Sequence, residues 1–462
     1  MDKLLITDAM KRNAAGSAWR VRFFHKRFFR RIVMQIPLDE LLYSLSRALD
    51  FVEQELLGVT TNHGKRTAYV TAHICKTMGL SDEAIFDMAC CAILHDNALT
   101  AYMLEAGISG IRQLEQMKIH CSKGEENASA FPFLGNVDGI ILHHHENWNG
   151  TGYHKLAGDD IPLRAIILRL ADIMDLQLKM GDGRDSLERE IRQHAQKQSG
   201  KFYAPMTVEA LNDTINDDFM YGLADCCIDE ALRSVVPPMQ SNLTTKQMLQ
   251  VCSIFALIID AKSPFTQNHS TGIVQKAARL ADIYGFDEHR KDKLMIAGYL
   301  HDVGKLSTPL SILEKPGPLD KDEFEIMKDH VAKTEEILIS VKGLEDITHW
   351  AAGHHETLDG GGYHHGYPGS DLPLEGRMLA CCDIFQALTE DRPYRKGMEF
   401  DRALKIMEDM AGRGKIDTHV VKTIKEEFAP RDEGVPEQFA FAMQRPSANV
   451  SGQVFKNTSL RS

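Results

Sequence analysis

Histidine and aspartate residues recur along the second half of the chain in an order that suits metal binding. Neutral imidazoles and carboxylates are the ligands that iron, manganese and zinc prefer in proteins. In the adjacent pair His301-Asp302 the histidine can bind one ion while the carboxylate bridges two, and paired ions can hold both the attacking and the leaving oxygen of a phosphoester. The second half therefore predicts a metal-dependent phosphohydrolase site built from His269, His301, Asp302, His330, His354, His355 and Asp383.

The same residue types occur in the same order in the first half, as His63, His95, Asp96, His120, His144, His145 and Asp172. The interval from His63 to His95 is 32 residues, as from His269 to His301, and the interval from His120 to His144 is 24 residues, as from His330 to His354. A single buried histidine is usually a core residue, but two matching sets indicate an internal repeat of one metal-binding unit.

The elements that must position these residues are predicted to be helices. From Ile36 onwards apolar residues recur with the period of a helix, and few segments alternate as strands do. Two groups each share one helical face, namely Ile85, Met88, Ala89 and Ala92, and Ile273, Ala277, Leu280, Ala281 and Tyr284. We expect an all-α protein with two tandem helical domains related by the repeat.

Changes in composition divide the chain. We predict a basic N-terminal extension over 1–34, a first domain over 35–236, a linker over 237–250, a second domain over 251–430 and a loosely ordered tail over 431–462. The extension interleaves arginine and lysine with phenylalanine, so it could make weak contact with an anionic membrane surface. A docking helix, or translation that begins at Met34, explains the same residues without a membrane.

Composition limits the remaining functions. The net charge of −12 argues against DNA or RNA as a partner, because no basic field would attract a phosphate backbone. The nine cysteines include vicinal pairs but no CxxC, which favours buried thiols in a reducing compartment. The chain has no run of about 18 apolar residues and no signal-peptide core. We expect a cytoplasmic protein.

Several further motifs surround the second set of ligands. They are AGYLHDVGK at 297–305, LEKPG at 313–317, HHE at 354–356, DGGGY at 359–363, Asp383, and LTEDRPYR at 388–395. Over 249–430 this order resembles the HD-GYP branch of the HD superfamily of phosphohydrolases. The resemblance implies two HD-type helical domains and a phosphodiesterase that opens a cyclic dinucleotide, either cyclic di-GMP or 3′,3′-cyclic GMP-AMP, to the linear dinucleotide.

The resemblance also implies roles for individual residues. One divalent ion, iron, manganese or similar, would be held by His269, His301, Asp302 and Asp383. Asp302 would be the catalytic bridge to a second ion held by His330, His354 and His355. Lys305 would neutralise a phosphate oxygen. Arg392 and Arg395 could contact the substrate or form surface ion pairs. Some members bind a third ion through a glutamate four residues before the first histidine, where this chain has Phe265, so we expect two ions.

One position departs from the family pattern. When the chain is aligned with the family on the glycine loop DGGGY at 359–363, the Gly-Tyr-Pro tripeptide of the family corresponds to Gly362-Tyr363-His364. This chain therefore has histidine in place of proline. The loop could therefore differ in substrate choice or partner docking. His364 and His365 could serve as extra ligands, or they could be exposed loop residues.

The first half keeps the ligands but not the other motifs. His95-Asp96 is followed by Asn97-Ala98-Leu99, with no lysine, and no Arg-Pro-Tyr-Arg follows Asp172. Buried histidine and aspartate are costly without a metal, so their retention predicts metal in this half also. Two hypotheses stay open: a phosphomonoesterase (5′-nucleotidase) acting on the linear product, or a metal-stabilised regulatory or dimerising domain.

Two alternatives apply to the whole chain. The same metal chemistry could serve another nucleotide as a phosphohydrolase, against which the KPG and RPYR segments argue for the second half. A non-catalytic receptor for cyclic dinucleotides is the alternative from another class. Retention of every ligand and of Lys305 argues against it.

Overall fold

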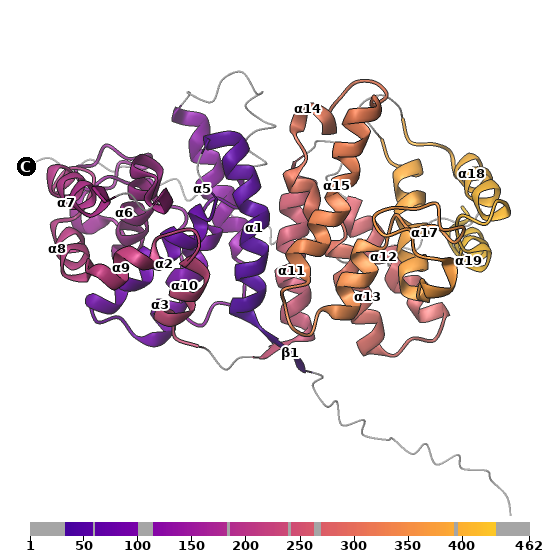
Figure 1. Cartoon of the computed structure of the whole chain (residues 1–462), viewed down its shortest axis with the longest axis horizontal. Coiled ribbons are helices and arrows are strands. Elements are labelled where there is room, and N and C mark those ends of the chain that lie inside the picture. The colour runs from indigo at the N-terminus through magenta and orange to yellow at the C-terminus, as the bar shows by residue number, and fades with distance from the viewer. Residues whose placement is uncertain are drawn as a thin grey trace, which may run out of the picture. The chain divides into compact units, whose positions relative to one another are not determined.

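Helices dominate the structure, a computed structural model that describes residues 33–58, 61–99, 114–182, 185–238, 242–262, 269–391 and 396–430 (Figure 1). The predicted all-α fold is confirmed. The sheet in this part of the chain has two short antiparallel strands, β1 (Val33–Pro37) and β2 (Asn242–Thr244), which pair Val33 with Thr244 and Pro37 with Asn242.

The first half contains the helices drawn from indigo to magenta in Figure 1. In chain order they are α1 (Leu38–Leu57), α2 (His63–Thr77), α3 (Asp82–Leu94), α5 (Leu114–Ala128), the short η1 (Gly158–Asp160), α6 (Leu163–Leu178), η2 (Met180–Asp182), α7 (Leu187–Gln198), α8 (Pro205–Thr214), α9 (Asp217–Gly222) and α10 (Ile228–Val235).

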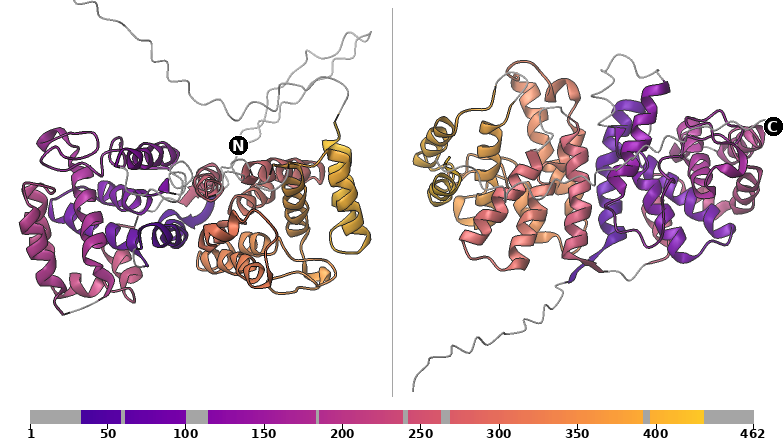
Figure 2. Two further views of the ribbon diagram at one scale, coloured as in Figure 1. Left: turned by 90° about the horizontal axis from the view of Figure 1, so that it is seen from above. Right: turned by 180° about the vertical axis from the view of Figure 1, so that it is seen from behind.

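The second half begins with α11 (Thr245–Asp260), which starts at a capping box formed by Thr244 and Gln247. It continues with α12 (His269–Ile283), α13 (Glu288–Leu300), the short η3 (Val303–Ser307), α14 (Leu310–Leu313), α15 (Lys321–Leu338), α16 (Glu345–Ala352), η4 (Gly369–Asp371), α17 (Leu374–Thr389), α18 (Phe400–Gly412) and α19 (Thr418–Phe428). The last two helices pack against each other and lie side by side in the view from behind (Figure 2).

Corresponding helices of the two halves match in length. The lengths are 15 residues for α2 and α12, 13 for α3 and α13, and 16 for α6 and α17. The ligand residues fall at the same places on them, since His63 and His269 each begin a helix and His95 and His301 each follow one. The repeat seen in the sequence is therefore a repeat of structure.

The apolar faces predicted from helical periodicity form the core. Ile85, Met88, Ala89 and Ala92 are buried, and so are Ile273, Ala277, Leu280 and Ala281. Removing a side chain the size of isoleucine or leucine from water contributes about 1.5–3 kcal/mol. These faces hold α3 and α12 rigidly, and both helices position metal-ligand residues.

The predicted boundaries can be compared with the elements. Residues 242–244 of the predicted linker form β2, and α11 begins at Thr245. Residues 1–32 of the predicted extension and the whole predicted tail lie outside the described residues, so the expected membrane contact and the loose tail stay predictions. No described helix has an apolar stretch long enough to cross a bilayer.

Candidate metal centres

Five helices, α12, α13, α15, α16 and α17, bring the predicted ligands of the second half together. His269 is the first residue of α12, His330 lies on α15, and Asp383 lies on α17. His301 directly follows α13 and Asp302 precedes η3, so the adjacent pair sits where the chain turns out of a helix rather than within one. His354 and His355 follow α16 in a turn, with ring centroids 4.0 Å apart.

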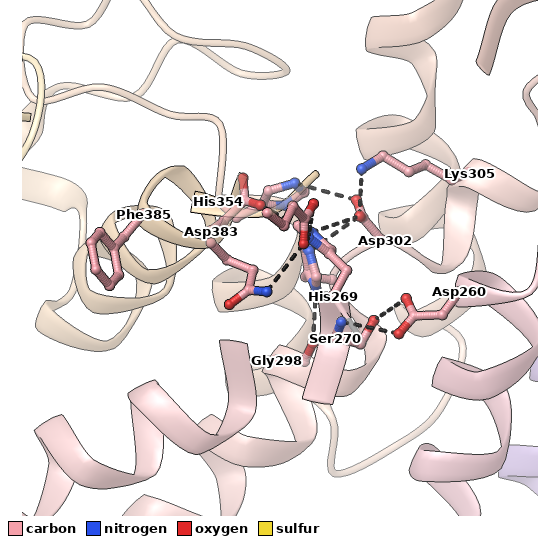
Figure 3. Close-up of polar contacts among 12 residues, drawn as sticks. Asp260, His269, Ser270, Gly298, Asp302, Lys305, His354, Asp383 and Phe385 are labelled. Atoms are coloured by element: carbon pink, nitrogen blue, oxygen red, sulfur yellow. Dashed lines mark hydrogen bonds and ion pairs between the residues drawn. The ribbon is translucent and has the colours of Figure 1, made fainter. Parts of the chain in front are cut away.

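The ligand atoms fall into two groups. In one group, possible ligand atoms of His269, His301 and Asp383 lie within 4.8 Å of one another, and in the other the same holds for His330, His354 and His355. Figure 3 shows His269, His354, Asp302 and Asp383 converging on one point, with Lys305 reaching Asp302. The structure thus brings together the seven residues that the sequence predicts.

Asp302 lies between the two groups. Its Oδ2 is 3.2 Å from Nε2 of His301 and 3.8 Å from Nε2 of His269. Its Oδ1 is 3.5 Å from Nε2 of His330 and 3.7 Å from Nε2 of His354. One carboxylate oxygen faces each group, which is the arrangement a bridging ligand needs.

Several of these buried atoms have no hydrogen-bond partner among the described residues. They are Nε2 of His269, His301, His330 and His354, and Oδ1 of Asp302. An unsatisfied buried polar atom costs about 1–3 kcal/mol, and charged groups cost more. Cations at the two groups would remove this cost, so the donor set fits metal ions.

Hydrogen bonds at Nδ1 prepare the histidines for this role. Nδ1 lies 2.6–2.7 Å from a backbone carbonyl oxygen in His301, His330 and His354. A carbonyl can only accept, so Nδ1 carries the proton and the lone pair of the neutral ring is on Nε2. Since Nε2 is the atom that faces the cluster, these rings are held in the tautomer that binds metal.

His269 has a carboxylate partner that the sequence analysis missed. Its Nδ1 lies 2.9 Å from Oε1 of Glu390, and in the first half Nδ1 of His63 lies 2.7 Å from Oδ2 of Asp175. Asp175 also accepts from Arg66. The two carboxylates lie at different spacings after Asp383 and Asp172, so the repeat alone could not reveal them.

Replacing Glu390 with glutamine is expected to weaken metal binding by the second half about 10- to 100-fold, because the ligand His269 loses a charged partner that orients it. Competition with a chromogenic chelator measures the affinity. Glu335→Gln is the matched control, since Glu335 also contacts histidine rings but none of the ligands. Equal affinities of the two variants would contradict the role given to Glu390.

Electrostatics puts Asp302, His330 and His355 in the protonation state that metal binding needs. Burial opposes ionisation of Asp302, but His301 and Lys305 hold its pKa well below the usual range. Burial, together with Lys305, lowers the pKa of His330 to about 3, and burial lowers the pKa of His355 to about 4. His269 differs, because Asp383 and Glu390 overcome burial and raise its pKa to about 9. A metal ion at His269 therefore displaces a proton.

The HDVGK segment at 301–305 also has a packing role. A Cβ on Gly304 would lie 2.0 Å from the carbonyl oxygen of His330 and 2.7 Å from the backbone nitrogen of Thr334. The backbone nitrogen of Gly304 donates to Oγ1 of Thr334 at 3.0 Å. This contact fixes η3 against α15 and so places Asp302 beside His330.

The glutamate of the HHE motif holds the following loop. Oε1 of Glu356 accepts from the backbone nitrogens of His365 and Gly366 at 2.7 and 3.0 Å. Glu146 of the first half binds the nitrogens of His154 and Leu156 in the same way. The glutamate therefore shapes the glycine loop rather than joining the ligand groups.

The side chains of His364 and His365 point to a surface partner. Their Nε2 atoms lie 3.1 and 2.9 Å from Oε2 of Glu335, and about a third of each side chain is exposed. This favours the interpretation as exposed loop residues over that as extra ligands. Arg392, Arg395 and Phe265 lie outside the described residues, so their expected roles stay predictions.

The first half repeats the arrangement. Ligand atoms of His63, His95 and Asp172 form one group. Oδ2 of Asp96 is 3.5 Å from Nε2 of His95, and its Oδ1 is 3.4 Å from Nε2 of His120 and 3.7 Å from that of His144. Buried atoms without a hydrogen-bond partner in the described part of this half include Nε2 of His63 and His95, Oδ1 of Asp96, and both carboxylate oxygens of Asp172. These residues fit metal as well as those of the second half.

Comparisons with known proteins agree with this geometry. A model of the HD domain family matches residues 51–192 and 253–420. The chain is 30% identical over 430 residues to 3'3'-cGAMP-specific phosphodiesterase 3 of Vibrio cholerae, with 81% of this chain and 91% of that protein covered. It is 28% identical over 402 residues to 3'3'-cGAMP-specific phosphodiesterase 1 of the same organism, with 85% and 92% covered.

A solved structure and a further relative point the same way. The crystal structure of a cyclic GMP-AMP specific phosphodiesterase of V. cholerae matches with a TM-score of 0.60 and 26% identity, over 87% of this chain and 99% of that chain. A cyclic di-GMP phosphodiesterase of Thermotoga maritima is 31% identical over 168 residues, which cover 36% of this chain and 46% of that protein.

Proposed function

The chain belongs to the HD domain family, and on that basis we propose that it is a metal-dependent phosphodiesterase that hydrolyses a cyclic dinucleotide to the linear dinucleotide. One observation carries the proposal: Asp302 lies between two groups of ligands, and Nε2 of the buried His269, His301, His330 and His354 lacks a hydrogen-bond partner in the described structure. The relatives matched over nine-tenths of their length are named for 3'3'-cGAMP, which supports this compound as the preferred substrate over cyclic di-GMP.

The second half holds the metal and the reacting phosphate. His269, His301 and Asp383 would hold one ion, and His330, His354 and His355 the other, with Asp302 shared by both. When bound, two divalent ions such as iron or manganese supply Lewis acidity toward the phosphoryl oxygen and stabilise the leaving oxygen. Asp302 stays ionised, and the hydrogen bonds at Nδ1 keep the rings of His301, His330 and His354 oriented.

Lys305 supplies positive charge beside the metal groups. Its Nζ contacts Oδ2 of Asp302, and 23% of its side chain is exposed. The ammonium group can therefore neutralise a non-bridging phosphate oxygen without leaving the site. This agrees with the role that the family resemblance implies for it.

Replacing Lys305 with methionine is expected to lower kcat for the cyclic dinucleotide about 10²- to 10³-fold, the usual cost of removing one group that stabilises a developing charge. Elemental analysis should show metal content unchanged. Lys333→Met is the matched control, because Lys333 pairs with Glu336 at the protein surface. A kcat for Lys305→Met equal to that of the control would remove Lys305 from the mechanism.

A second activity for the first half is supported by its unpartnered ligand atoms. We propose that it binds metal and removes the terminal phosphate of the linear product, as a 5′-nucleotidase does. Leu99 stands where the second half has Lys305, but the guanidinium of Arg169 lies 2.9 Å from Nδ1 of His145 and supplies positive charge there. The alternative is a metal-stabilised regulatory domain without turnover.

Assays with three separate substrates distinguish these functions. Protein loaded with Mn²⁺ or Fe²⁺ would be given 3'3'-cGAMP, cyclic di-GMP and a linear dinucleotide with a 5′ phosphate. We expect ring opening of 3'3'-cGAMP, and release of inorganic phosphate from the linear compound. Binding of both cyclic compounds without cleavage would support a receptor instead. Cleavage of the linear compound alone would support a phosphohydrolase with another substrate.

A further inference from the structure

A thiol lies in the second ligand group of the first half. Cys121 follows His120 on α5 and is fully buried. Possible ligand atoms of His120, Cys121, His144 and His145 all lie within 4.8 Å of one another. The residue after His330, at the same place in the second half, is the buried Val331. The two halves therefore differ inside an otherwise repeated ligand set.

The distances among His120, His144 and Asp96, and from His120 to Cys121, fit a tetrahedral zinc ion. Zn–N bonds of about 2.05 Å and Zn–S bonds of about 2.3 Å place neighbouring nitrogens about 3.3 Å apart and sulfur about 3.6 Å from nitrogen. Nε2 of His120 lies 3.4 Å from Nε2 of His144 and 3.6 Å from Sγ of Cys121. Oδ1 of Asp96 lies 3.4 Å from Nε2 of His120 and 3.7 Å from that of His144.

Asp96 is an independent sign of a cation at this point. Its side chain is 6% exposed, and its Oδ1 has no hydrogen-bond partner within the described ranges. That oxygen faces the group that contains Cys121. An ionised carboxylate oxygen in such surroundings needs a positive charge to offset its desolvation.

His145 is unsuited to complete this group. Nη1 of Arg169 lies 2.9 Å from Nδ1 of His145, and Nη2 of Arg169 lies 3.0 Å from Oδ1 of Asn147. A guanidinium has no acceptor atom, so Nδ1 of His145 must accept and the proton of the neutral ring is on Nε2. A protonated Nε2 has no lone pair for a metal. His144 has the opposite tautomer, since its Nδ1 lies 2.6 Å from the carbonyl oxygen of Ile141.

We propose that Cys121 replaces His145 as a metal ligand in the first half, so that His120, Cys121 and His144 hold Zn²⁺ together with the bridging Asp96. Nε2 of His145 lies 3.1 Å from Nε2 of His120, so its N–H then becomes a hydrogen-bond donor that faces the site. Thiolate ligands favour zinc over manganese or magnesium, so the two halves would hold different metals. The thiol loses its proton to solvent when the metal binds. The inference rests on the proposal that the first half binds metal.

The experiment uses Co²⁺ in place of Zn²⁺, because a thiolate ligand gives cobalt a charge-transfer band in the near ultraviolet. The full chain with Asp302→Asn, which weakens the metal site of the second half, is compared with the same chain carrying Cys121→Val or His145→Gln. Valine at 121 reproduces the residue that the second half buries at this place. Cys252→Val, which changes another fully buried thiol, controls for unrelated cysteines.

We expect the band in the parent chain, in His145→Gln and in Cys252→Val, and its loss in Cys121→Val. Zinc affinity should fall in Cys121→Val by more than the roughly 10- to 100-fold that loss of a partner outside the ligand set costs. Bound cobalt without the band, or zinc affinity lost in His145→Gln but kept in Cys121→Val, would overturn the inference. If the first half binds no metal, the inference fails together with the proposal for that half, while cyclic-dinucleotide cleavage by the second half remains measurable on its own.

Discussion

Asparagine in place of Asp302 is expected to lower the rate of cyclic-dinucleotide hydrolysis by at least about 10³-fold. The carboxylate places one oxygen toward each ligand group, and it is ionised because His301 and Lys305 hold its pKa well below the usual range. Asparagine keeps the shape but offers one neutral oxygen, so it cannot bridge two cations. Metal ions contribute several kcal/mol to stabilising the transition state, and each 1.36 kcal/mol is a tenfold change in rate.

The chain contains its own control for this change. Asp96 occupies the same place in the first half, with its oxygens 3.5 Å from His95 and 3.4 Å from His120. Asp96→Asn is expected to lower metal content in the first half and leave cleavage of the cyclic substrate in place. Rates and elemental analysis of both variants give the comparison. If activity survived in Asp302→Asn and disappeared in Asp96→Asn, the reaction would take place in the first half, and the assignment to the second half would be wrong.

Removal of the metals is expected to destabilise the fold. Without a cation, the buried carboxylates of Asp302 and Asp383 and the unpartnered nitrogens of the cluster keep their desolvation cost. A ligand present at about 1,000 times its Kd stabilises the folded state by about 4 kcal/mol per site. Thermal unfolding with and without a chelator measures the effect, and the midpoint should fall by several degrees.

Measuring bound metal and stability together tests whether the loss of stability comes from the empty sites. Midpoints are followed while Mn²⁺ or Zn²⁺ is returned to the chelated protein, with bound metal measured in parallel. Stability should rise as the sites fill, and less in Asp302→Asn, where the second half has lost its bridging ligand. An unchanged midpoint in protein shown to be free of metal would mean that the clusters are stable without cations.

The spacing of ligand residues predicts much of this structure. The equal intervals from His63 to His95 and from His269 to His301 reflect helices of equal length, because α2 matches α12 and α3 matches α13. Apolar residues on one face of each helix, such as Ile273 and Leu280, predict the core. Local periodicity is enough for the apolar faces because each is set within a single helix, and the repeat is enough for the matched helix lengths.

Features that depend on distant contacts could not be predicted. Glu390, at the end of α17, contacts Nδ1 of His269, and Arg169, on α6, contacts Nδ1 of His145. Nothing in the spacing of either pair repeats between the halves, so no pattern marks them. Cys121 could have been noticed as the residue after His120, but a buried thiol is common in helix interiors. Only the geometry around His120 and His144 shows that the sulfur of Cys121 lies among ligand atoms.

The small sheet was also beyond sequence reasoning. β1 and β2 are 5 and 3 residues long, too short to show an alternating pattern, and they pair across more than 200 positions of the chain. Strand β2 therefore lies within the predicted linker of residues 237–250. The N-cap of α11, Thr244, ends this strand, so the second half starts directly from it.

In this account the second half hydrolyses a cyclic dinucleotide only when its two ligand groups hold divalent ions. The most direct measurement is the rate of 3'3'-cGAMP cleavage by metal-free Asp96→Asn protein as Mn²⁺ or Fe²⁺ is added back. We predict no cleavage without metal, and a rate that rises with bound metal until the second half holds two ions, with linear dinucleotide as product. Bound metal at that stoichiometry with the cyclic compound intact would contradict the account.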